Sequence, residues 1–438
     1  MKKALALLLA TVMLLSLAAC GVENQPTTGN KKDPATAPTT PTTQPTTPTT
    51  KPTEPTEPSK PEDNSTVIAE NDSFVLKVLS VTSDAESYTL ALYMENKSAA
   101  TLSLNVSNVS ANDYVCPDIF MYCDLAAGQN ATDVLTIERA VLDRNGITDP
   151  TKVEFSLFVM DAVSWAEVYN ASCAYYPMGE ENHVDDGGYT AKEGDTVLVD
   201  NESCTVIVTG YEPDNALGYT MNLYILNKTA LNLTFSPNNV TVNGLMLDPW
   251  WSTEMAAGKR AHCSVTWFGS EMTDYNIGDV TMISFGLSAL DATNWEAADL
   301  AGVTATVYPM GEEAAKPFER PSAETDIVLM DNEYVTIIAT SIGTDADGNY
   351  TMVLFMQNKA QQNIFIKPSN VCINGIELDP WWGATVTAGK ATFGSISWFA
   401  SDFEYNGITA VETITMTVSV FDEFGMETFV TEDITIHP

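Results

Sequence analysis

The stretch YTMNLYILNKT, from Tyr219 to Thr229, decides the fold because it recurs at a fixed spacing. Downstream the chain reads YTMVLFMQNKA from Tyr350, and upstream it reads YTLALYMENKS from Tyr88. The starting tyrosines are equally spaced, since 219 − 88 = 131 and 350 − 219 = 131. A period of this length is that of a whole domain rather than of a solenoid unit. The sequence therefore predicts three copies of one small domain.

Each copy reads as a series of short strands. The run 101–107 places Leu102, Leu104 and Val106 on one face, and the run 152–159 alternates in the same way. Gly, Asn, Asp and Pro turn signals separate about seven or eight such runs in each copy. No helical period of useful length is present. The predicted fold class is all-β, with three tandem immunoglobulin-like antiparallel β-sandwich domains.

We place these three domains, called modules 1, 2 and 3, at residues 65–178, 190–310 and 324–438. The joins between them, at residues 179–195 and 311–325, are polar and carry Gly or Pro. Few apolar residues occur there, so we expect limited contact between modules.

Residues 1–20, MKKALALLLATVMLLSLAAC, have the form of a secretory signal peptide. Lys2 and Lys3 precede an apolar run that is too short for a comfortable membrane span. The ending Leu17-Ala-Ala-Cys20 resembles the lipobox of bacterial lipoproteins. The resemblance implies cleavage before Cys20, diacylation of its thiol and anchoring at the extracellular face of the bacterial cell membrane. An ordinary signal peptide with an incidental cysteine is the alternative.

Residues 21–64 form a Pro/Thr-rich linker with almost no hydrophobic residues. Nothing in it offsets the entropy of ordering, so we expect it to be disordered. A Pro-rich chain favours extended polyproline II, which gives a stalk on the order of 100 Å at full stretch. The density of Thr is also compatible with O-glycosylation.

The charge balance restricts the partners. The chain has 58 acidic and 20 basic residues, for a formal net charge of −38. Nucleic acids bind through Lys and Arg, so this composition argues against a nucleic-acid partner, and likewise against anionic lipid surfaces. The acidity favours a role in solubility, with binding of cations or basic partners as the alternative.

Paired tryptophans in modules 2 and 3 are the candidate ligand-binding residues. They are Trp250 and Trp251 in one module and Trp381 and Trp382 in the other, each pair after Asp-Pro. Neighbouring side chains in a strand face opposite ways, so one of each pair can be core while the other is displayed to a glycan or protein. Packing inside the sandwich, or between modules, is the competing interpretation. Module 1 carries the stretch 116–123 instead.

Other repeated motifs have simpler interpretations. Trp267 and Trp398 share a strand face with apolar residues and are predicted to be core. The Asn-Lys pairs that follow a strand in each copy predict turns. The acidic clusters at 70–72, 200–202 and 331–333 contain ligands that suit calcium, but they lie where Asn and Asp make bends. Residues 345–349 predict a Gly turn, and we expect neither metal nor cofactor.

Six cysteines remain after Cys20, and they do not form a repeated framework. Cys116 and Cys123 could pair across their loop, and Cys204 and Cys263 could bridge the two sheets of module 2. Module 3 has Cys372 alone, so the fold does not require such a bond. Export permits disulfides without proving them.

Catalysis has little support in the sequence. His183 lies in a join, His262 has no counterpart in the other copies, and His437 is the penultimate residue. No Ser-His-Asp or Cys-His arrangement recurs, and no His cluster offers zinc ligands. We therefore expect that the protein is not an enzyme.

The motifs NKT, NNVTVNG, AAGK and SVTW, behind a lipobox and a Thr/Pro stalk, resemble a known group. They resemble the uncharacterised immunoglobulin-like domains of Gram-positive bacterial lipoproteins, which are related in fold to a secreted mycobacterial immunogenic antigen. The resemblance implies a sandwich fold and a surface location. It implies no activity and no catalytic residues.

The leading hypothesis is a cell-surface lipoprotein whose three modules present a binding or adhesion array for an extracellular glycan or protein. Repetition would supply reach and avidity. A structural spacer or envelope-assembly subunit without a ligand of its own is the second hypothesis. A divergent hydrolase, with a cleft that gathers Asp or Glu with a His, is the third.

Overall fold

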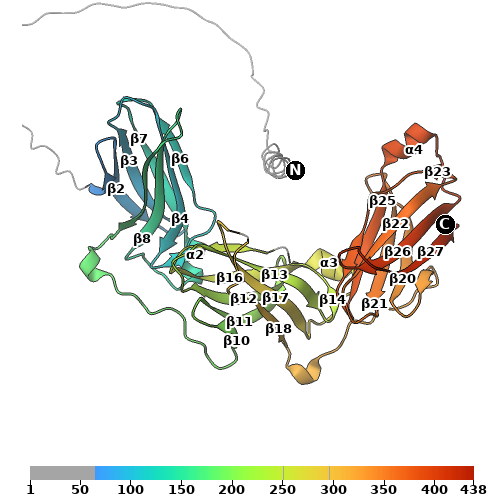
Figure 1. Ribbon diagram of the computed structural model, residues 1–438. Helices are drawn as coiled ribbons and strands as arrows, with labels where there is room; N and C mark the ends of the chain where they lie inside the picture. Colours follow the sequence, from blue (N-terminus) through green and yellow to red (C-terminus); the bar gives the residue numbers. More distant parts are fainter. Residues whose placement is uncertain (1–64, 250, 295) are drawn as a thin grey trace, which may run out of the picture. The chain divides into compact units, whose positions relative to one another are not determined.

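The computed structural model of the chain describes residues 65–438 except 250 and 295 (Figure 1). The predicted signal peptide, the predicted lipid attachment at Cys20 and the predicted linker at 21–64 lie outside the described residues. Within the described part, no helix is long and apolar enough to cross a membrane.

Module 1 is built from nine strands and one short helix. They are β1 Thr66–Glu70, β2 Phe74–Ser83, β3 Ser87–Asn96, β4 Leu102–Ala111, β5 Tyr114–Val115, β6 Met121–Leu125, β7 Asn130–Glu138, α2 Arg139–Arg144, β8 Val153–Asp161 and β9 Glu167–Tyr175. The alternation predicted at Leu102, Leu104 and Val106 is confirmed, since all three side chains are buried.

Modules 2 and 3 repeat this order of elements. A 3₁₀ turn precedes each, at Glu180–Asn182 and at Glu312–Ala314. Module 2 contains β10 Thr196–Asp200, β11 Cys204–Asn215, β12 Gly218–Asn227, β13 Leu233–Val242, β14 Leu245–Met246, β15 Thr253–Met255, β16 Arg260–Phe268, α3 Gly269–Asp274, β17 Ile283–Asp291 and β18 Val303–Val307. Module 3 contains β19 Ile327–Asp331, β20 Val335–Thr344, β21 Tyr350–Asn358, β22 Ile364–Ile373, β23 Ile376–Glu377, β24 Ala384–Val386, β25 Ala391–Trp398, α4 Ala400–Asn406, β26 Ile414–Asp422 and β27 Thr428–Ile436.

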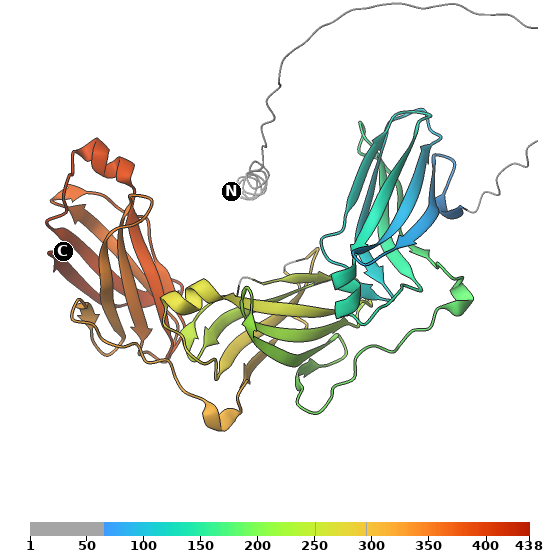
Figure 2. The ribbon, with the colours of Figure 1, turned by 180° about the vertical axis from the view of Figure 1, so that it is seen from behind.

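The predicted all-β sandwich is confirmed. In module 1 one layer has the strand order β1-β2-β3-β7, and the other contains β4, β5, β6, β8 and β9. The neighbours β3 with β7 and β4 with β8 are not consecutive in the chain, as in immunoglobulin-type sandwiches. Every module encloses a hydrophobic cluster between its layers. Figures 1 and 2 show each short helix beyond the ends of the strands, and the sequence had not indicated these helices.

The same irregularities recur at the repeat period, which shows that the copies share one backbone. The third long strand of each module shifts register around an Asn with a left-handed backbone, at Asn108, Asn239 and Asn370 (φ 52, 50 and 51°). Asn tolerates this conformation better than other residues with a side chain.

A tight hairpin follows in every module, and its turn residues also have positive φ. The turns are Asn112-Asp113, Asn243-Gly244 and Asn374-Gly375. Two successive residues with positive φ, led by Asn, are characteristic of type I′ hairpins. These hairpins, called VNG hairpins below, have the sequences AND, VNG and ING at residues 111–113, 242–244 and 373–375. The local sequence therefore determines where the hairpin strands β5, β14 and β23 begin.

The expectation of limited contact between modules is wrong. The Arg260 amide donates to the Asp113 carbonyl at 3.0 Å, and the Ala391 amide donates to the Gly244 carbonyl at 3.4 Å. Through these contacts β5 pairs in parallel with β16, and β14 with β25. Two sheets thereby continue from one module into the next.

Candidate functional site: the paired-tryptophan loops

In modules 2 and 3, a hydrogen bond from a core tryptophan holds the leucine that precedes the Asp-Pro-Trp-Trp loop. The indole N–H of Trp267 donates to the Leu247 carbonyl at 3.0 Å, and that of Trp398 donates to the Leu378 carbonyl at 2.9 Å. Trp267 and Trp398 are buried, which confirms that both are core residues. A buried indole usually satisfies its N–H in this way, so the loop has a defined origin in both modules.

In module 3 the two indoles of the loop point to different environments. Trp381 is 96% exposed, whereas Trp382 is half-buried and packs against the module core. The cause is not strand alternation, because residues 378–383 are not in a strand. Trp381 instead has a left-handed backbone (φ 50°), and its amide donates to the Asp379 carboxylate at 3.1 Å.

This conformation is costly for a bulky side chain. Residues that hold such strain cluster at ligand sites, so an observed outlier motivates a functional hypothesis.

A hollow of about 310 Å³ lies beside the displayed ring. Its lining combines aromatic rings with one cationic and one anionic group: Phe365, Lys367, Asp379, Trp381, Trp382 and Gly383. A Cβ at Gly383 would lie 2.7 Å from the Phe365 ring, so glycine is needed for the loop to pass this closely. Flat apolar rings next to a few charged groups can hold the face and the polar rim of a ligand.

Module 2 has a counterpart with different details. A hollow of about 500 Å³ is lined by Pro237, Asp248, Trp251 and Ser252. Trp251 is half-buried and packs against the core of module 2, as Trp382 does in module 3. Trp250 lies outside the described residues. The position of Lys367 is occupied by Ser236 in module 2, so the two hollows differ in charge.

Module 1 displays aromatic residues that the sequence analysis did not select. Phe120 is 80% and Tyr122 is 55% exposed, both in the stretch that replaces the tryptophan pair. The Tyr122 hydroxyl donates to the Asp124 carboxylate at 2.8 Å, which also accepts from Ser103. The signal was present, because this stretch contains aromatic residues at the place of the tryptophans.

Exposed apolar side chains also occur at the hairpin tips opposite the VNG hairpins. Val163 and Trp165 are exposed in module 1, and Phe424 and Met426 are exposed in module 3. Trp295 of module 2 lies outside the described residues. These positions had no repeated sequence motif, because the residue types differ between copies.

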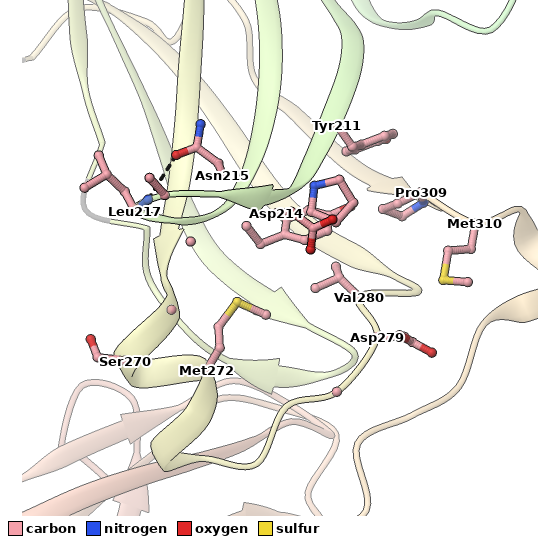
Figure 3. Close-up of a pocket in the computed structure, with 16 residues that line it drawn as sticks. Tyr211, Asp214, Asn215, Leu217, Ser270, Met272, Asp279, Val280, Pro309 and Met310 are labelled. Carbon is pink, nitrogen blue, oxygen red and sulfur yellow. Dashed lines mark hydrogen bonds between the residues drawn. The ribbon is translucent and has the colours of Figure 1, made fainter.

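A further hollow, of about 910 Å³, lies at one end of module 2 (Figure 3). Tyr211, Asp214, Leu217, Met272 and Met310 line it together with backbone from glycine-containing turns. The Leu217 amide donates to Asn215 at 3.1 Å and holds the β11–β12 turn at its rim. Burial raises the pKa of Tyr211 to about 12, so its phenol is neutral near pH 7. The lining combines polar and apolar side chains, so it suits a ligand of mixed polarity.

Neither of the two possible disulfides is formed, and the six cysteines from 116 to 372 are free thiols. Cys204 and Cys263 do not bridge the sheets, because both lie in the same sheet with β12 between them. They face β12 at Asn227 and Leu223, four residues apart, or about 13 Å along the strand. A disulfide requires Cα atoms within about 7 Å.

The Cys116–Cys123 bond is also not formed. Cys116 is buried and donates to the Tyr114 carbonyl at 3.7 Å, while Cys123 lies on β6. Burial raises the pKa of the Cys116 and Cys263 thiols to about 12 and that of Cys204 to about 11. Thiols of this kind are inert, since the thiolate is the reactive form.

The Asn of each Asn-Lys pair has a structural role beyond a turn. Asn96, Asn227 and Asn358 are almost fully buried. The Asn227 side-chain amide donates to the carbonyls of Leu231, Met255 and Ala256. Asn96 makes the three corresponding bonds, and Asn358 makes two of them. Each Asn thus joins the end of one strand to a loop in the other sheet.

The acidic clusters are bends, in agreement with the simpler interpretation. The Asn201 side chain accepts from the amides of Ser203 and Cys204, and Asn71 and Asn332 do the same in their modules. Asp345 accepts from the amides of Asp347 and Asn349 and closes the predicted Gly turn. No group of three or more ligating side chains that could hold a metal is found among the described residues.

The histidines are far apart in the sequence and occupy different surroundings. His183 contacts the Thr151 hydroxyl at 2.9 Å, and His437 lies near Thr413. His262 is stacked on Tyr114 of module 1, with ring centroids 6.0 Å apart. Burial lowers the pKa of His262, and the nearby charges of Lys192 and Arg144 lower it further.

No family model matches this chain, and no curated protein matches it. Its similarities are to solved structures. One comes from work on host cell surface retention of a 1.5-MDa bacterial ice-binding adhesin, with 13% identity, a TM-score of 0.15, and coverage of 80% of this chain and 90% of that chain. A biofilm associated protein BSP domain has 9% identity and a TM-score of 0.15, with 83% and 96% covered. Red sea bream transglutaminase has 8% identity and a TM-score of 0.17, with 50% and 29% covered. Values this low carry no argument about function.

Proposed function

We propose that this chain is a surface lipoprotein whose sandwich modules bind an extracellular glycan or protein through their aromatic loops. A lipid on Cys20 would anchor it at the outer face of the bacterial membrane, and residues 21–64 would hold the modules away from that membrane. The proposal contains no catalytic step and no cofactor.

The exposure of Trp381 is the observation that carries the proposal. An indole that is 96% exposed gains nothing from burial in its own module. Its left-handed backbone adds a conformational free-energy cost, and the hydrogen bond from its amide to Asp379 stabilises this conformation. The ring is therefore maintained in solvent by the loop, and a ligand that covers it would recover the burial free energy.

The residues around Trp381 define the ligand chemistry. A sugar ring can stack its C–H face on the indole while its hydroxyls reach Lys367 and Asp379, which line the same hollow. A protein ligand with an exposed aromatic or basic side chain could use the same groups, since Trp is favoured at binding hot spots. Several aromatic loops on one chain would add avidity.

A glycan and protein array probed with the chain from residue 21 tests this proposal. Trp381→Ala should reduce binding at least about 10-fold, as expected for a hot-spot aromatic. Trp165→Ala is the matched control, because Trp165 is also exposed and has positive φ but lies outside the paired-tryptophan loops. Equal binding by both variants, with unchanged thermal unfolding, would exclude the loop as the site.

One observation favours the spacer alternative. Modules 1 and 2 are joined by largely buried ion pairs, such as Lys259 with Asp113 at 2.7 Å, and continuous sheets join each module to the next. Such joints suit a stiff spacer as well as a binding array. Failure of the wild-type chain to bind any class on the array would favour the spacer.

A further inference from the structure

The contact between modules 1 and 2 and the contact between modules 2 and 3 are the same interface repeated. The Arg260 amide bonds to the Asp113 carbonyl, and the Ala391 amide bonds to the Gly244 carbonyl. Donor and acceptor both move by the repeat period, since 391 − 260 = 131 and 244 − 113 = 131. In each case the VNG hairpin of one module adds a short parallel strand to the start of an outer strand in the next.

A second contact is repeated beside the first. Asn145, at the end of α2, accepts from the His262 amide at 3.1 Å. At the end of α3, Tyr275 stacks on Phe393 with ring centroids 4.7 Å apart and planes 3° from parallel. His262 and Phe393 are also 131 residues apart. The interface therefore consists of a hairpin and the end of a short helix on one side, and of an outer strand on the other.

Module 3 has the hairpin side of this interface already built. The Asn374 side chain accepts from the amides of Glu412 and Thr413 and fixes the turn before β23. Asn112 fixes the turn before β5 in the same way, through the amides of Thr151 and Lys152. Such preorganisation lowers the cost of binding.

The same side of module 3 is exposed. Tyr114 and Leu245, the hairpin residues of modules 1 and 2, are 5% and 0% exposed, whereas their counterpart Ile376 is only half-buried. Asn406, the counterpart of Tyr275 at the end of the helix, is half-buried, and the neighbouring Tyr405 is 90% exposed. The hairpin position that is covered in both internal interfaces is thus partly open to solvent here.

Module 1 has the strand side of the interface, and it is also exposed. Leu102 pairs with Leu125 in module 1, and its counterpart Leu233 pairs with Met255 in module 2. The segment between the paired residues is therefore one residue longer in module 1. After this segment, corresponding residues of modules 1 and 2 are 130 positions apart instead of 131. Asn130, at the start of the outer strand β7, is therefore the counterpart of Arg260. Asn130 is exposed, whereas Arg260 is 6% exposed.

We propose that this chain associates head to tail with a second copy of itself. The hairpin at residues 374–377 of one copy pairs with the start of β7 in the other, and the Gly375 carbonyl accepts from the Asn130 amide. Asn406, the counterpart of Tyr275, lies against Thr132, the counterpart of His262. A second copy is the occupant because both internal interfaces already join this hairpin to this strand within one chain. The interface is heterologous, so it generates chains of molecules rather than closed dimers.

Charge makes this association weak and dependent on salt. Glu377 and Glu404 are exposed beside the hairpin and helix, and Glu95 and Asp133 lie beside Asn130. Lys259, which joins modules 1 and 2, is replaced by Gln129 at this position. Salt screens repulsion between such exposed groups. Association should therefore strengthen as salt is raised, opposite to an interface held by ion pairs.

Sedimentation velocity of the chain from residue 21, over a range of concentrations at low and high salt, tests the proposal. The wild type should form species of two and more chains. Ile376→Asp places a charge at the hairpin position that both internal interfaces cover, and Asn130→Pro removes the amide donor at the first residue of a strand, where Pro is tolerated. Each should weaken association at least about 10-fold, as for an interface hot spot. Phe424→Asp, at an exposed hairpin tip elsewhere in module 3, should leave it unchanged.

A mixture of the two variants separates interface loss from misfolding. Ile376→Asp retains the strand side and Asn130→Pro retains the hairpin side, so the mixture should form complexes of two chains and no longer ones. A single-chain mass for the wild type at all concentrations and salts would overturn the proposal. So would association that Ile376→Asp and Asn130→Pro affect no more than Phe424→Asp does. The test is independent of the ligand proposed above, because it requires none.

Discussion

The Lys259 ammonium of module 2 lies 2.7 Å from the Asp113 carboxylate of module 1. It also lies 2.9 Å from Glu154, and Lys152 bridges the same two carboxylates at 2.9 and 2.7 Å. Two ammonium and two carboxylate groups thus form a compact square, with Lys259 only 9% exposed at its side chain. In a chain with net charge −38, this cluster is locally neutral and joins two modules.

Lys259→Met should loosen this joint. The substitution keeps the aliphatic stem but leaves Asp113 and Glu154 with Lys152 alone. Removal of one partner from a buried pair is destabilising because a charge stays behind. We expect a loss of about 2 kcal/mol, less than for a fully buried pair because the carboxylates keep some contact with water. Urea unfolding measures it, and Lys228→Met, which removes an exposed pair with Asp200, should cost much less.

The acid sensitivity of this cluster has a defined direction. Burial raises the pKa of Asp113, but hydrogen bonds from Lys259 and Lys152 outweigh it and bring this pKa to about 2, below the ordinary 3.8. A depressed carboxyl pKa contributes stability that is present above the unfolded pKa and is lost as pH falls. Asp113→Asn should therefore be destabilising at neutral pH, and the difference from wild type should shrink between about pH 4 and pH 2. A constant difference over that range would contradict the assignment.

His262 should act in a different pH window. Its pKa is lowered from 6.5, so the folded chain favours neutral imidazole and loses stability as pH falls through 6.5 toward the lowered value. His262→Phe places at this position the residue that module 3 has at Phe393. The variant should retain ring stacking on Tyr114 and should lose less stability than wild type between about pH 7 and pH 5. Thermal unfolding of the wild type and of His262→Phe at both pH values measures this difference. An equal loss of stability in the two proteins would contradict the prediction.

Much of this fold was accessible from the sequence for a simple reason. Burial on one face produces alternation, and Leu102, Leu104 and Val106 carry it clearly. The period of 131 residues then transfers each assignment to two more copies. The core role of Trp267 and Trp398 followed from the same pattern, because their strand neighbours are apolar.

The features that were missed depend on backbone details and on contacts between distant segments. Strand alternation was expected to display one tryptophan of each pair without showing which, whereas in module 3 a left-handed loop residue displays Trp381. Cys204 and Cys263 face inward as expected, yet strand order places both in one sheet, which no spacing reveals. The contact between modules did have a signal, since Lys259 and Arg260 are adjacent basic residues in a strongly acidic chain. Only the pairing of β5 with β16 shows what they meet.

Asn358→Ala should destabilise module 3 without changing its surface. The Asn358 amide donates to the Gln362 carbonyl at 2.9 Å and to the Val386 carbonyl at 2.8 Å, and its oxygen accepts from the Ala360 amide. Alanine removes the hydrogen-bond partner of these three backbone groups at a position that is only 1% exposed. We expect a loss of about 2–3 kcal/mol, measured by urea unfolding. Gln361→Ala, an exposed neighbour in the same loop, should change stability by less than about 0.5 kcal/mol.

Thiol counting tests whether the cysteines stay reduced. The chain from residue 21 contains six cysteines, and all six are free in the structure. In denaturant without reductant, a thiol reagent should therefore titrate all six. A count of four would reveal one disulfide, and peptide mapping would show whether it joins Cys116 to Cys123.

In the folded chain, Cys372 should react first, because it is half-exposed and its Sγ lies 3.8 Å from the Asn370 carbonyl at the module edge. Cys204 and Cys116 should react slowest, because both are buried and burial raises the pKa of their thiols to about 11 and about 12. In the Cys204→Ser variant the other five thiols should all be titrated and should react in the same order as in the wild type. A changed reactivity of Cys263 in this variant would indicate a bond between Cys204 and Cys263.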